Sequence, residues 1–247
     1  MRKFAAAIFA LLCCLPAAAR DLLVIGTHFE RVYERGQEGE IVGLGPEIVR
    51  LIAERLGHRA IFELYPWARA QALVAQGKAD ILVGPYKTFE RQQLMSFSKL
   101  PFYQDQMVFY VRKGALQDWS GDYASLSELR IAIVNGWSYG AAFDKARPQL
   151  RLDVVNSVDS GLKMLAAQHA QMFASNRRNT EPVLGRLGLS GQLAMLPKVI
   201  EVQDGYFAFP KRPAADALRK EFDVEFQRLV DSGELKRLGL RHEVSVP

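Results

Sequence analysis

Short apolar runs alternate with amphipathic stretches along most of the chain. Runs of strand length occupy 21–27, 60–64, 80–84 and 103–111. Between the first two, the apolar residues Ile48, Leu51, Ile52 and Leu56 recur at helical spacing. The alternation starts again after residue 111, with strand-like runs at 130–134 and 152–155 that each precede a helical pattern. This order predicts an α/β fold with largely parallel sheets in two lobes.

The segment 67–102 carries the most informative pattern. Pro66 suits the start of a helix, Gly77 its end, and a buried strand follows at 80–84. A polar loop is expected after that strand, with Arg91 on it. Ligands of open α/β sheets bind beyond the carboxyl ends of the strands, so the pattern predicts Arg91 at a binding cleft. The alternative is a surface arginine that pairs with a neighbouring glutamate.

Residues 1–19 have the pattern of a cleaved signal peptide. Arg2 and Lys3 precede a short apolar run, and small alanines end the segment. We therefore expect an exported, periplasmic protein. Both cysteines, Cys13 and Cys14, lie inside this segment, and a lipid-anchored form is the alternative. Without them the mature chain has no disulfide, no thiol nucleophile and no thiolate metal site.

Composition and charge narrow the possible classes of function further. With 247 residues and 49% hydrophobic content, the chain can bury one large core or two small ones. The net charge of +5 becomes +3 without Arg2 and Lys3, and basic residues are scattered among acidic ones. This favours a solvated surface over a nucleic-acid or membrane footprint. The histidines at 58, 169 and 242 lack ligand-like spacing, so we expect no metal and no cofactor, and we expect a monomer.

Several motifs occur together in a fixed order over nearly the whole mature chain: Gly43-Leu-Gly-Pro-Glu-Ile-Val with Leu56-Gly57, Gly77-Lys-Ala-Asp80, Thr88-Phe-Glu-Arg91, Phe97-Ser-Lys-Leu-Pro-Phe102, Asn135-Gly-Trp-Ser-Tyr139 and Ser232-Gly-Glu-Leu-Lys. In this the chain resembles periplasmic solute-binding proteins of the polar amino acid ABC-transporter type, bacterial extracellular family 3, which have the type-II periplasmic binding fold. The resemblance implies two lobes, joined by two hinge strands, that close on a small solute. Lobe 1 would be 21–110 plus 205–247, and lobe 2 would be 111–204.

The resemblance also implies roles for individual residues. Arg91 matches the arginine that grips a ligand carboxylate, and a guanidinium can make two parallel bonds to such a group. Trp67 would form an aromatic wall, although a core position is equally open for it. The turn after Gly136 would contact the same carboxylate through its backbone amides. The full set of candidate ligand-binding residues is Arg91, Thr88, Tyr86, Gly84, Trp67, Tyr65, Ser138, Tyr139, Trp137, Asn176, Phe29 and His28.

Two departures from the family pattern bear on the ligand. Asn176 stands where amino acid binders carry an aspartate that holds the α-ammonium, and asparagine has no charge. Tyr86 replaces a small hydroxyl residue and would narrow the site. An α-amino acid remains the default ligand, with another small carboxylate as the alternative.

The resemblance favours binding without catalysis and delivery to an ABC permease. One alternative is a module that reports ligand to a membrane sensor. The other is an enzyme similar to cyclohexadienyl dehydratases, which need a carboxylic acid near the turn in the second lobe. The segment from Asn135 to Phe143 carries none.

Overall fold

The computed structural model describes residues 20–115 and 119–247, so the predicted signal peptide lies outside the described residues. The strands are β1 (Asp21–Gly26), β2 (Glu34–Arg35), β3 (Ile41–Val42), β4 (Arg59–Leu64), β5 (Ile81–Tyr86), β6 (Met95–Phe97), β7 (Tyr103–Arg112), β8 (Arg130–Val134), β9 (Arg151–Val155), β10 (Met172–Asn176) and β11 (Leu193–Pro210). The helices are α1 (Leu44–Arg55), α2 (Trp67–Ala75), α3 (Phe89–Leu94), α4 (Ala141–Ala146), α5 (Val158–Ala166), α6 (Arg177–Arg186), α7 (Pro213–Asp231) and α8 (Glu234–Arg241). Two 3₁₀ turns occupy Ala124–Leu126 and Arg147–Gln149.

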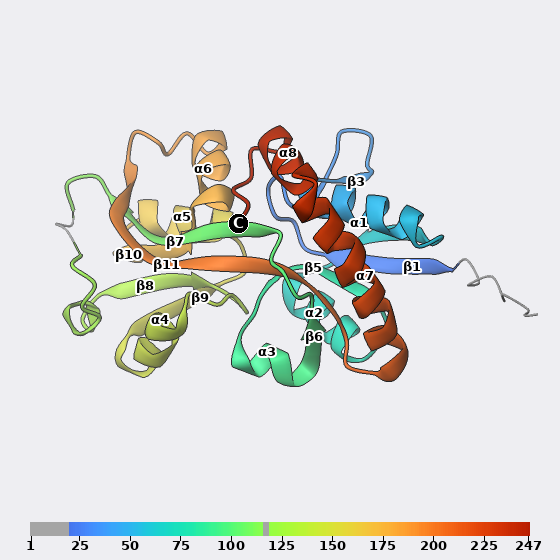
Figure 1. Cartoon of the computed structure of the whole chain (residues 1–247). Helices are drawn as coiled ribbons and strands as arrows, with labels where there is room; N and C mark the ends of the chain where they lie inside the picture. The colour runs from blue at the N-terminus through green and yellow to red at the C-terminus, as the bar shows by residue number, and fades with distance from the viewer. Residues whose placement is uncertain (1–19, 116–118) are drawn as a thin grey trace, which may run out of the picture.

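Two groups of parallel strands are connected by two long strands that cross the molecule (Figure 1). In the first lobe, β1 lies between β4 and β5 and runs parallel to both. In the second lobe, β8 lies between β10 and β9, again parallel to both. Strands β7 and β11 pair with each other in antiparallel fashion, and they join β5 on one side to β10 on the other. The predicted α/β architecture with two lobes and two connecting strands is confirmed.

Helices cover the sheet of the first lobe on both sides, with α1, α7 and α8 on one side and α2 and α3 on the other (Figure 1). Helix α1 shows why the sequence folds this way. Its buried residues include Ile48 and Ile52 of the apolar stripe seen in the sequence, and Leu51 and Leu56 of that stripe are partly buried. The helix starts at Leu44, two residues before Pro46, because Gly43 adopts a positive φ of 116° that a side chain would oppose.

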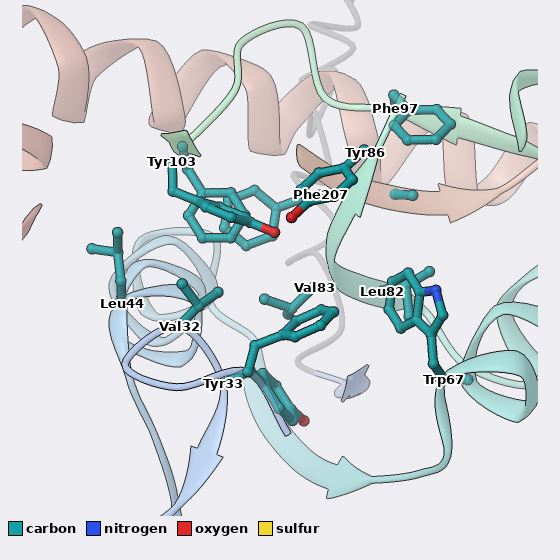
Figure 2. Packing of buried hydrophobic residues seen from close by; sticks show 14 of the residues in the cluster. Val32, Tyr33, Leu44, Trp67, Leu82, Val83, Tyr86, Phe97, Tyr103 and Phe207 are labelled. Atoms are coloured by element: carbon teal, nitrogen blue, oxygen red, sulfur yellow. The ribbon is translucent and has the colours of Figure 1, made fainter. Parts of the chain in front are cut away.

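Aromatic side chains fill the core where the first lobe meets the connecting strands (Figure 2). Phe102 stacks on Phe207 with ring centroids 4.2 Å apart, and Tyr103 packs against Phe102 at 4.8 Å. The hydroxyl of Tyr103 donates to the carbonyl of Gly84 at 2.7 Å, so this buried polar group is satisfied. The core thereby fixes the end of β5, which carries the candidate site.

The predicted loop after the strand at 80–84 is wrong. The strand continues to Tyr86, and α3 follows directly. Thr88 is the N-cap of this helix, and its hydroxyl accepts a hydrogen bond from the backbone N–H of Arg91 at 3.3 Å. A threonine at the N-cap whose side chain binds the N–H three residues later is a common helix start. With only six residues, the helix leaves little pattern in the sequence.

Over the part of the chain that the structure describes, no helix combines the length and apolar character needed to cross a bilayer.

The residue boundaries given for the two lobes stay a prediction.

Candidate ligand-binding site

A small hollow lies between the two lobes, at the carboxyl ends of β1, β5 and β8. Its volume is about 10 Å³, roughly the space of one water molecule. Seven of the predicted site residues line it: Phe29, Trp67, Gly84, Tyr86, Arg91, Trp137 and Ser138. Residues far apart in the sequence therefore meet where the topology brings the strand ends together.

Arg91 connects the two lobes across this hollow. It lies in α3, and its Nη1 donates to the carbonyl of Tyr86 at 2.9 Å. Its Nη2 donates to the carbonyl of Gly136, in the second lobe, at 3.0 Å. Burial lowers the pKa of Arg91, although an arginine remains protonated at any ordinary pH. Two carbonyl oxygens thus occupy positions where the guanidinium fork can bind the oxygens of an anion.

Trp67 supports the same contact. Its Nε1 donates to the carbonyl of Gly136 at 3.2 Å, and the guanidinium of Arg91 lies 5.6 Å from its ring centroid. Phe29 packs between Trp67 and Trp137, with centroid distances of 5.3 and 6.1 Å. Trp67 is 8% exposed, so it belongs to the core and also lines the hollow. Trp67 therefore fits both interpretations left open by the sequence, a core residue and part of an aromatic wall.

A buried polar network lies behind Tyr86. The Tyr86 hydroxyl donates to Oδ2 of Asp105 at 2.7 Å. Arg178 binds the same carboxylate through Nε and Nη2 at 2.8 and 2.7 Å. Burial, together with the negative charge of Asp105, raises the pKa of Tyr86 well above its ordinary value, so its hydroxyl remains a donor.

Asn176 belongs to this network rather than to the lining of the hollow. Its Oδ1 accepts the backbone N–H of Asn179 at 2.8 Å, which caps α6. Its Nδ2 donates to the Tyr86 hydroxyl at 3.4 Å, and the residue is 1% exposed. Asp105 and Arg178 were missed by the sequence reasoning. The signal was a charged residue inside the strand-like run at 103–111, because a buried charge requires a partner.

The structure does not bring four other predicted residues into the hollow. Tyr139 is fully buried, and its hydroxyl accepts the backbone N–H of Val134 at 2.7 Å. Tyr65 donates to the carboxylate of Glu63, and Thr88 caps α3. His28 lies at the rim of a neighbouring cavity of about 360 Å³, which shares Trp67 and Trp137 with the hollow.

His28 also belongs to a group of possible metal ligands. Among the described residues, His28, Glu30 and Glu34 each place one ligand atom within 4.8 Å of the others. His28 and Glu30 already share a hydrogen bond of 3.2 Å, and Arg186 lies 4.0 Å from Glu30. Glu30 therefore has neutralising partners within the chain.

Comparison with known proteins agrees with the fold. The family model for bacterial extracellular solute-binding proteins, family 3, matches residues 24–242. No curated protein sequence matches the chain. A histidine kinase sensor domain with similarity to periplasmic binding proteins superposes with a TM-score of 0.82 at 18% identity, covering 93% of this chain and 99% of that one.

Two binding proteins superpose almost as well. A mutant of ArgBP from T. maritima gives a TM-score of 0.75 at 18% identity, covering 90% of this chain and 94% of its own. A substrate-binding protein of an ABC uptake transporter from Streptococcus pneumoniae, solved with bound histidine, gives 0.75 at 15% identity, covering 90% and 91%. At these identities the likeness concerns the fold, which is of the type-II periplasmic binding class. Because the family model spans nearly the whole described chain, the protein belongs to the bacterial extracellular solute-binding proteins of family 3.

Proposed function

We propose that the protein binds a small carboxylate outside the cytoplasm, closes on it, and delivers it to an ABC permease. An amino acid is the default ligand from the family, whose structural neighbours include a protein solved with bound histidine. One observation carries the proposal: Arg91 is the only charged residue among those that line the hollow. Its guanidinium faces oxygen atoms from both lobes, as a carboxylate clamp requires.

The hollow as it stands has room for little more than a water molecule. Ligand entry therefore requires the lobes to separate, and β7 with β11 are the strands that join them. The lobe boundaries at 110/111 and 204/205 are part of this proposal. So is the cleavage of residues 1–19 as a signal peptide, which the amino-terminal sequence of the secreted protein would test.

Titration calorimetry with a set of amino acids and other small carboxylates tests the clamp. Arg91→Gln should weaken binding by about a hundredfold, because charge-assisted bonds to a carboxylate are lost. Arg130→Gln is the matched control, since Arg130 pairs with Asp153 on the surface, far along the sheet. Unchanged affinity in Arg91→Gln would contradict the proposal.

A sensory role is the second candidate. One feature favours it: the superposition on a histidine kinase sensor domain, which covers 99% of that chain. A permease gene beside this gene would support transport, whereas a sensor-kinase gene would support sensing.

We propose no catalysis at this site. The residues that line the hollow include no carboxylic acid that could serve as a general acid. Incubation of the purified protein with prephenate provides the test, and measurable turnover would overturn the assignment.

A further inference from the structure

The residues that line the hollow include a charged partner for an anion but no carboxylate for a cation. Its only charged lining residue is Arg91, and four of its other side chains are the aromatic rings of Phe29, Trp67, Tyr86 and Trp137. The carbonyl oxygens around it are engaged as well. Those of Tyr86 and Gly136 accept from Arg91, and that of Gly84 accepts from the Tyr103 hydroxyl. A ligand that enters would therefore meet positive charge and apolar surface.

The carboxylate of Asp105, which lies behind Tyr86, is shielded from the hollow. Asp105 is 2% exposed, and both of its oxygens are bound by Arg178. The ring of Tyr86 lies on the hollow side, and its hydroxyl donates to Oδ2 of Asp105. While Tyr86 and Arg178 occupy this carboxylate, an ammonium group in the hollow has no access to it.

Asn176 cannot replace that carboxylate. Its one acceptor oxygen caps α6 through the N–H of Asn179, and its amide nitrogen is a donor that faces the Tyr86 hydroxyl. Ser138 is the remaining polar side chain, and its hydroxyl donates to Asp144 at 3.2 Å. The Asp144 carboxylate is already paired with Arg147, whose Nε donates to it at 2.6 Å. A neutral hydroxyl can accept one hydrogen bond but does not neutralise a buried charge.

Covalent geometry places an α-ammonium in the same hollow as the carboxylate. A single carbon separates the two groups, so a ligand clamped by Arg91 would bring its ammonium close to the guanidinium and the aromatic rings. The carboxylates of Glu30 and Asp159 line only the neighbouring cavity, where both pair with Arg186.

We propose that the site accepts a carboxylate without an α-ammonium, with a flat, apolar body that packs between the aromatic rings. This inference rests on the proposed function, because it specifies the ligand class of the same site. Tyr86 is the residue that determines the specificity, since its ring covers the carboxylate of Asp105.

Matched ligand pairs test the proposal by titration calorimetry on the mature protein. The pairs are phenylalanine with 3-phenylpropionate, tryptophan with indole-3-propionate, and leucine with 4-methylpentanoate. We expect the member without the amino group to bind about a hundredfold more tightly, because a buried ammonium would lack a partner. Equal or tighter binding of the amino acids would overturn this inference and leave the proposed function intact. Failure of all carboxylates would overturn the proposed function, and this inference with it.

A variant provides an independent readout. Tyr86→Ser removes the ring that covers Asp105, so the preference against amino acids should fall by about tenfold or more. Tyr65→Ser makes the same change at a tyrosine outside the hollow, and the preference should persist. If Tyr86→Ser bound its ligands with the wild-type preference, the specificity role of Tyr86 would be refuted.

Discussion

The ion pair between Asp105 and Arg178 should be indispensable to the stability of the protein. Their side chains are 1% and 10% exposed, and two hydrogen bonds of 2.7 and 2.8 Å join them. Asp105→Asn keeps the shape of the side chain but leaves the charge of Arg178 without its counter-ion. Removing one partner of a buried pair costs about 3–5 kcal/mol.

That loss should be visible in both chemical and thermal unfolding. In a chain of this size each kcal/mol lowers the melting temperature by about 2–4 °C, so the expected fall is roughly 6–20 °C. Urea unfolding with linear extrapolation gives the free energy of unfolding directly, and calorimetry gives the melting temperature.

The control is an exposed pair with the same chemistry. Arg59 binds Asp21 through two bonds at the protein surface, where the side chains are 74% and 48% exposed. Many surface pairs contribute nothing measurable, so Asp21→Asn should unfold like the wild type. A second comparison combines Asp105→Leu with Arg178→Met, which removes both charges and should recover most of the lost stability. If Asp105→Asn were as stable as Asp21→Asn, the reasoning from burial would be refuted.

Three further predictions follow from single contacts. Trp67→Phe removes the donor to the Gly136 carbonyl and should increase the radius of gyration of the ligand-free protein in small-angle scattering; an unchanged radius would mean that this bond does not hold the lobes together. Asn176→Ala removes the cap of α6 and should cost about 0.5–2 kcal/mol in urea unfolding, whereas Asn176→Asp, which can still cap, should cost less. His28 has a pKa raised above 6.5, chiefly by its hydrogen bond to Glu30 and against the opposing effect of burial. Its stabilising contribution is therefore complete below pH 6.5 and is lost as pH rises through the folded-state pKa. The melting temperature measured against pH should fall over this range, and His28→Gln should flatten the fall.

The periodic features of the sequence were sufficient to predict the architecture. The strand at 130–134 coincides with β8, and the helical spacing from Ile48 to Leu56 corresponds to α1. These elements are predictable because each buries a regular apolar face, so apolar residues recur in the sequence at the spacing of that face. The helix α3 was not predicted, because six residues with no buried side chain leave no apolar period.

The candidate site was predictable only in part, for a different physical reason. Arg91 and Trp67 follow recognisable helix and strand boundaries, so their positions at strand ends could be inferred. The position of Asn176 outside the hollow could not be inferred from the sequence. It depends on the contact between its amide and the Tyr86 hydroxyl, 90 residues away in sequence, and on the pairing of Asp105 with Arg178. Side-chain partners across lobes have no local signature.

Under the proposed function, the Arg91 guanidinium would hold both the ligand and the second lobe. In the structure its Nη2 donates to the Gly136 carbonyl and joins the second lobe to the first. A carboxylate must take over part of this bonding, and its charge-assisted bonds are roughly twice as strong as those to a neutral carbonyl. The exchange therefore favours the ligand at Arg91, while Trp67 can retain the Gly136 carbonyl through Nε1. A ligand shifts the equilibrium between separated and closed lobes only by its difference in affinity for these two states. The difference in bond strength at Arg91 therefore sets how far the ligand controls the spacing of the lobes.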